Sequence, residues 1–158
     1  MRDEGGSAVA GASRLIGWFA VLVAVAGCAT AAPDVLARYR VEGDAIREPL
    51  ASAPGDAARG RDVLLGRDGN CLLCHAVPET GARFMGNLAP SLSGVGARLS
   101  EGQLRLRIVD SMRLNRETIM PSYFRIDGLN QVAEAWRGKP VLTAQQVEDT
   151  VAYLLTLR

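Results

Sequence analysis

Apolar residues recur at helical spacing in two segments of the second half of the chain. Residues 100–115, SEGQLRLRIVDSMRLN, begin with a capping box formed by Ser100 and Gln103, and a later segment begins the same way with Thr143 and Gln146. The apolar positions behind each cap fall on one face of a helix: Leu104, Ile108, Val109 and Met112 in the first segment, and Val147, Val151, Leu154 and Leu155 in the second. Both segments are therefore predicted to be amphipathic helices.

Shorter helices are predicted elsewhere. Asp56 is a candidate N-cap for a helix that ends at Gly66, and residues 129–137 are expected to form another. Residues 78–96 are rich in Gly, Pro, Ser and Asn, so they are expected to be mostly loop. No segment of strand length alternates between apolar and polar residues, and no internal repeat is visible. The pattern indicates an all-α fold whose long loops need something in the interior to hold them.

Composition is consistent with one domain built around a non-protein group. The 158 residues suit a single compact domain with accessory segments. Apolar residues make up 48% of the chain but aromatic residues only 5%, so a flat apolar group would help to fill the core. The formal net charge of +1 gives no indication of nucleic-acid or membrane binding.

Residues 1–31 are expected to be an export signal. Arg14 precedes the apolar run LIGWFAVLVAVA, and small residues follow it. The run is shorter than the roughly 20 apolar residues of a membrane-spanning helix, which favours a cleaved signal. An uncleaved membrane anchor is the alternative to a signal. VAGC resembles a lipobox that would leave Cys28 lipid-modified, whereas ATA at residues 29–31 fits ordinary cleavage, and both stay open. We expect a periplasmic protein that meets the membrane only if Cys28 is lipidated.

Residues 32–55 are expected to be an extended N-terminal arm, followed by the folded domain over residues 56–158. The arm carries three prolines and has no sustained period. Its apolar residues Tyr39, Ile46 and Leu50 have no helical period, so we expect them to pack against a partner protein.

The segment GNCLLCHAVPE, residues 69–79, holds two of the three cysteines and the only histidine. Cys71 and Cys74 face the same side of a helical turn, so their thiols can bond to the two vinyl groups along one haem edge. His75 follows directly and can bind the iron, which is the attachment pattern of c-type haem. A redox dithiol would need a strand before the motif, and a zinc site would need four ligands. With a chance match as the remaining alternative, we predict one covalent haem c.

Methionine is the expected sixth ligand of the iron, because the chain has no second histidine. Met120 lies in a loop before Pro121, far enough from His75 to reach the opposite haem face. Met112 lies on the apolar stripe and is interpreted as core filler, and Met85 is too close to His75 to cross the haem.

A proline is expected to orient the histidine. A ligating histidine usually donates its other ring N–H to a carbonyl, which fixes the tautomer. In APSL, residues 89–92, Pro90 would supply that carbonyl from a rigid turn, with an ordinary loop proline as the alternative.

Taken together, these segments resemble class I c-type cytochromes, and more narrowly the SoxX family, the small subunits of SoxAX sulfur-oxidation cytochromes. The resemblance is carried by PGDAARGR, GNCLLCHAVPE, GNLAPSLSGVGARLSEGQLRLRIVD, TIMPSYFRIDGL and RGKPVLTAQQVEDTVAYLLTLR, which span most of residues 54–158. Ala89 departs from the glycine that the family generally has before the proline. The resemblance implies a class I cytochrome c-like helical fold around one haem.

The resemblance also implies a role in a heterodimeric enzyme. SoxAX proteins couple thiosulfate oxidatively to a cysteine of the carrier SoxYZ, as an L-cysteine S-thiosulfotransferase with its reactive haem on SoxA. This chain would accept electrons and pass them to a small downstream cytochrome, and no catalytic residue is expected on it. A free-standing periplasmic electron carrier is the alternative. Six arginines against three acidic residues over residues 98–125 could guide anionic thiosulfate or an acidic partner, or form a solvated helix face.

Overall fold

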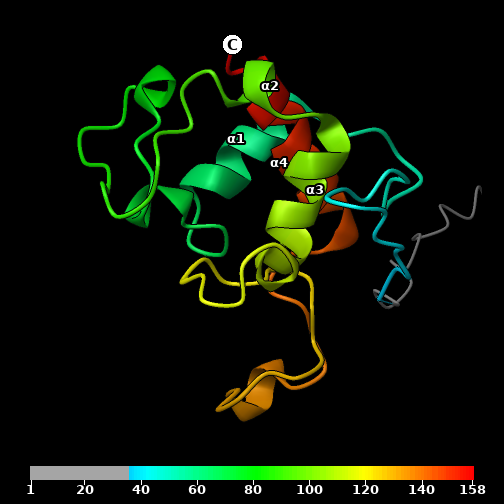
Figure 1. Cartoon of the computed structure of the whole chain (residues 1–158). Coiled ribbons are helices and arrows are strands. Elements are labelled where there is room, and N and C mark those ends of the chain that lie inside the picture. Colours follow the sequence, from blue (N-terminus) through cyan, green and yellow to red (C-terminus); the bar gives the residue numbers. More distant parts are fainter. Residues whose placement is uncertain (1–35) are drawn as a thin grey trace, which may run out of the picture. The chain divides into compact units, whose positions relative to one another are not determined.

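The protein's structure, a computed structural model, describes residues 36–158, which form short helices joined by long loops (Figure 1). The expected signal segment and Cys28 lie outside these residues. The helices are α1 (Ala57–Leu65), α2 (Val95–Arg98), α3 (Glu101–Asp110) and α4 (Ala144–Thr156), and the 3-10 turns are η1 (Cys71–Leu73), η2 (Pro78–Thr80), η3 (Ser111–Arg113) and η4 (Glu134–Trp136). Strand pairing in this part of the chain is limited to one bridge between Glu42 and Ala45. The predicted all-α class is confirmed, and no helix in the described range is long and apolar enough to cross a membrane.

The predicted helix starts are confirmed by their hydrogen bonds. Ser100 accepts a hydrogen bond from the backbone N–H of Gln103, whose side chain accepts one from the Ser100 N–H. Thr143 and Gln146 form the same capping box at α4. Asp56 caps α1. Each such cap stabilises its helix by about 1 kcal/mol.

Two predicted helices are shorter than expected. The segment that begins at Ser100 leaves the α-helical path at Asp110, whose φ of −151° and ψ of 78° are not helical, and residues 129–137 form only η4 within a long loop. This break turns the apolar stripe away from the core at Met112, which is 37% exposed. The prediction that Met112 fills the core is therefore wrong.

The central helix of the domain is α4, which packs against both α1 and α3 (Figure 1). At Gly60 the backbone of α1 comes so close that a Cβ atom would lie 1.8 Å from the Asp149 carbonyl oxygen, so glycine is required there. Beside it, Arg59 Nη2 lies 2.7 Å from Asp149 Oδ1 and ties the same two helices together.

Residues 36–55 pack against the helices, unlike the extended arm that we expected. Ile46 is fully buried and Leu50 is 8% exposed, and both belong to the main core cluster. The Ile46 N–H donates to the Gly102 carbonyl at 3.0 Å. The expectation that Ile46 and Leu50 pack against a partner is wrong, because the chain's own helices cover them.

A buried arginine fastens this segment to the helices. Arg105 donates from Nε and Nη2 to the two carboxylate oxygens of Glu148, each at 2.8 Å, and Nη2 also bonds Glu101. Its Nη1 donates to the Ile46 carbonyl at 2.8 Å, and Glu148 also accepts from the Leu50 N–H at 2.8 Å. Burial alone would lower the pKa of the Arg105 guanidinium, but the bonds to Glu148 raise it, so the group stays charged. One ion pair thus joins three segments.

Candidate functional site

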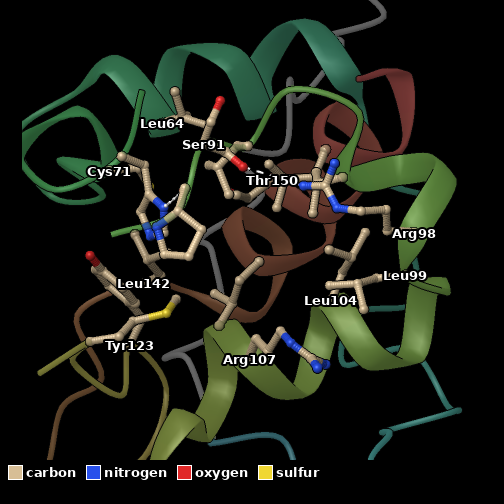
Figure 2. A pocket seen from close by; sticks show the side chains of 17 residues that line it. Leu64, Cys71, Ser91, Arg98, Leu99, Leu104, Arg107, Tyr123, Leu142 and Thr150 are labelled. Atoms are coloured by element: carbon tan, nitrogen blue, oxygen red, sulfur yellow. Dashed lines mark hydrogen bonds between the residues drawn. The ribbon is translucent and has the colours of Figure 1, made fainter. Parts of the chain in front are cut away.

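Two adjoining cavities, of about 440 and about 390 Å³, are walled by the helices and the loops between them. Both are lined by Cys71, His75, Pro90, Met120 and Tyr123. The larger one is otherwise mostly apolar, with walls that include Leu64, Leu92, Val95, Leu104, Ile108 and Leu142 (Figure 2). Four of the five shared residues were predicted as site residues.

The haem-attachment motif forms a tight turn at the cavity wall. The backbone N–H groups of Cys74 and His75 both donate to the Cys71 carbonyl, at 3.2 and 2.9 Å. Cys71 lines both cavities and Cys74 lines the smaller one, so both predicted attachment residues reach the site. Burial raises the pKa of the Cys71 thiol to about 11.

The His75 ring is held by the residue that the sequence suggested. Its Nδ1 lies 2.6 Å from the Pro90 carbonyl oxygen. A carbonyl can only accept a hydrogen bond, so Nδ1 carries a proton and Nε2 is the nitrogen left to bind a metal. This is the tautomer that can bind a metal through Nε2.

The three methionines of the described residues have different surroundings. Met85 Sδ accepts a hydrogen bond from the Val77 N–H at 3.1 Å, and Met112 Sδ accepts one from Arg125 Nη2 at 2.9 Å. Neither of these methionines lines a cavity that contains His75, whereas Met120 lines both. The structure therefore brings His75 and Met120 to one site and engages the other two sulfur atoms elsewhere.

Two arginines in the cavity wall were not assigned to the site from the sequence. Arg98 and Arg107 lie at the end of the cavity away from Cys71 (Figure 2). Neither forms an ion pair with a carboxylate among the described residues. In the sequence, only Arg107 could have been recognised as a site residue, because it lies between Leu104 and Ile108 on the apolar face of α3. With Arg105 buried in its ion pair, the arginines of residues 98–125 do not form one solvated face.

Tyr123 is the remaining site residue that sequence reasoning missed. Its hydroxyl donates to the Gly69 carbonyl at 2.7 Å, and its backbone carbonyl accepts from the Leu142 N–H at 3.0 Å. Burial, with a smaller contribution from Cys71 and Cys74, raises the pKa of Tyr123 to about 12, so the hydroxyl remains a donor at neutral pH. Its position three residues after Met120 was the only feature of the sequence that could have indicated a place in the site.

Comparison with known proteins places this geometry in a family. The sequence model of the family described as cytochrome c matches residues 57–158. The chain belongs to the cytochrome c family. The solved structure described as SoxXA from P. pantotrophus contains a chain that is 33% identical, with a TM-score of 0.70, over 75% of this chain and 93% of that one. No curated protein matches. The class I cytochrome fold is thereby confirmed, and the match supports a SoxX-type member of the family.

Membership implies one covalently bound haem c, and the residues present fit such a group. A haem is a flat, largely apolar disc, and the mostly apolar walls of the larger cavity suit such a group. Its vinyl groups and its two propionates lie on opposite edges. Cys71 at one end of the cavity can therefore bond the vinyl edge while Arg98 and Arg107 meet the propionates at the other. Bound in this way, the haem would supply an iron that gains and loses one electron.

Proposed function

We propose that this chain is the haem-bearing electron-transfer subunit of a SoxAX-type enzyme. Cys71 and Cys74 hold the haem through thioether bonds, and His75 Nε2 and Met120 Sδ bind its iron. One observation carries the proposal: the chain's only histidine, with Nδ1 fixed by Pro90, shares an apolar cavity with Met120 and Cys71. Methionine opposite histidine raises the reduction potential and suits an electron acceptor.

The bond-forming chemistry belongs to a SoxA-type partner. In that reaction, thiosulfate and a carrier-protein thiol of SoxYZ join through a new S–S bond, and two electrons and the thiol proton are released. Within residues 36–158 there is no third cysteine and no second histidine to act as nucleophile or base. This chain accepts the electrons one at a time and passes them to a small acceptor cytochrome.

An apolar rim at the smaller cavity supports docking of a protein partner there. Leu88 and Ile119 line this cavity, and their side chains are 67% and 69% exposed. Leu73, inside the Cys71–Cys74 turn, is 69% exposed. Leu88 and Ile119 are thus exposed apolar side chains at one opening, which is typical of a surface that a partner covers. A partner bound here would bring its own haem close to this one.

A free-standing electron carrier is the second candidate. It is favoured by the packing of residues 36–55, because Ile46 and Leu50 are covered by α3 and α4 and need no partner. The two candidates differ in what accompanies the protein and in what reduces it.

Purification from the native source separates them. A complex subunit should copurify with a second c-type cytochrome, and its haem should be reduced by thiosulfate only when the partner and carrier are present. Exchanging Leu88 and Ile119 for aspartate should release the partner while the haem stays covalently attached. A protein that purifies alone, and that the variants do not affect, would be a free carrier.

We also propose that the protein is exported to the periplasm. A c-type haem and the apolar run of residues 15–26 support this location. Mass spectrometry of the mature N-terminus decides the processing: a diacylated Cys28 indicates lipoprotein cleavage, and a start near Ala32 indicates ordinary cleavage. An intact Met1 would contradict export by either route.

A further inference from the structure

One hydrogen bond joins the loop that carries Met120 to the loop that carries Cys71. Tyr123 lies three residues after Met120, and its hydroxyl reaches the Gly69 carbonyl, two residues before Cys71, at 2.7 Å. No other hydrogen bond within residues 36–158 connects these two loops. The Tyr123 ring itself forms part of both cavity walls.

The other bonds of the Met120 loop run in a different direction. Ser111 donates its hydroxyl to the Met120 carbonyl at 2.6 Å, and the Tyr123 N–H donates to the Ile108 carbonyl at 3.0 Å. These bonds fasten the loop to α3 and η3, on one side of the cavity. Only the Tyr123 hydroxyl bridges to the haem-attachment side.

The acceptor of this bond has little freedom to move. Gly69 lies so close to the end of α1 that a Cβ atom there would be 2.3 Å from the Val63 carbonyl oxygen. Because Gly69 is packed against the end of α1, its carbonyl can serve as an anchor to which the Tyr123 hydroxyl holds the Met120 loop.

We infer that Tyr123 is a positioning residue for the iron, which keeps Met120 at the sixth coordination position by tying its loop to the attachment turn. The inference rests on the proposed function, because it takes Met120 as the ligand. An external ligand can bind the iron only while Met120 is displaced, so its apparent affinity reports the population of the open loop. Loss of the Tyr123 hydroxyl should raise that population.

Imidazole titration of the oxidised holoprotein at constant pH tests this role. Its binding is followed by loss of the far-red sulfur-to-iron charge-transfer band. Because a net hydrogen bond is modest in strength, Tyr123→Phe should bind imidazole about three- to tenfold more tightly than the unaltered protein. The band should still be present before imidazole is added, which a general loss of folding would not allow.

Tyr153→Phe is the matched control. Tyr153 is a buried tyrosine of α4 that lines neither cavity, so its imidazole affinity should stay unchanged. Unchanged affinity in Tyr123→Phe, or an equal increase in Tyr153→Phe, would overturn the inference. If Met120 is not the iron ligand, the result is different. The unaltered protein then lacks the far-red band, or keeps it when Met120 is replaced by alanine.

Discussion

Replacing Glu148 by glutamine tests how strongly the buried ion pair holds the domain together. Glutamine keeps the size of the side chain, but it removes the negative charge and turns one acceptor toward Arg105 into a donor. The Arg105 and Glu148 side chains are 1% and 5% exposed, so water cannot replace the lost partner. Removing one member of a buried pair typically costs about 3–5 kcal/mol. Glu101, which is 57% exposed, still bonds Arg105, so we expect the lower end, about 3 kcal/mol.

Denaturant and thermal unfolding of the holoprotein, followed by far-ultraviolet circular dichroism, measure this loss. For a domain of this size, 3 kcal/mol corresponds to a melting temperature lower by about 10 °C. Glu101→Gln is the control, since it removes an exposed partner of the same arginine and should cost less than about 1 kcal/mol. The far-red band should not change, because neither Arg105 nor Glu148 lines a cavity. If the Glu148 and Glu101 variants were equally stable, the claim that burial makes this pair important would be refuted.

Three further changes have defined outcomes. Met120→Ala should abolish the far-red band of the oxidised protein while Met85→Ala keeps it; the reverse pattern in absorption spectra would refute the ligand assignment. Burial alone would raise the pKa of Asp149, but its bonds to Arg59 and other groups lower it below the usual carboxyl range. Its contribution to stability is therefore complete above the ordinary carboxyl pKa and is lost as the pH falls through the lowered value. Asp149→Asn should flatten the fall in unfolding free energy between about pH 5 and pH 2, and an unchanged acid profile would contradict this. Gly60→Ala should destabilise the protein by more than about 2 kcal/mol in denaturant unfolding, because its Cβ has no room beside the α4 backbone, and normal stability would show that the helices can separate.

The sequence was most informative where a few neighbouring residues determine the local structure. Ser100 and Gln103 predict the start of α3 because a capping box needs only residues three apart. The attachment turn and the Pro90 carbonyl could be predicted for a similar reason, since the chemistry of each demands particular residue types.

Long-range packing was harder to predict. Residues 36–55 lack a helical period, yet Ile46 and Leu50 are buried and bond Arg105 of α3 and Glu148 of α4, which lie 59 and 98 positions away in the sequence. Arg107 and Tyr123 gave only weak local signals, because an arginine or tyrosine on a helix or loop is usually a surface residue. Met112 was misassigned because its apolar stripe was extrapolated past the break at Asp110.

The cavity has a consequence for how the protein is made. An apolar cavity of about 440 Å³ would cost on the order of 10 kcal/mol if it were closed and empty, which is comparable with the whole stability of a typical domain. The haem is thus part of the hydrophobic core, and the polypeptide without it has little reason to adopt this arrangement of helices. We therefore expect attachment of the haem and folding to be coupled, so that the Cys71–His75 segment is still accessible when the thioether bonds form.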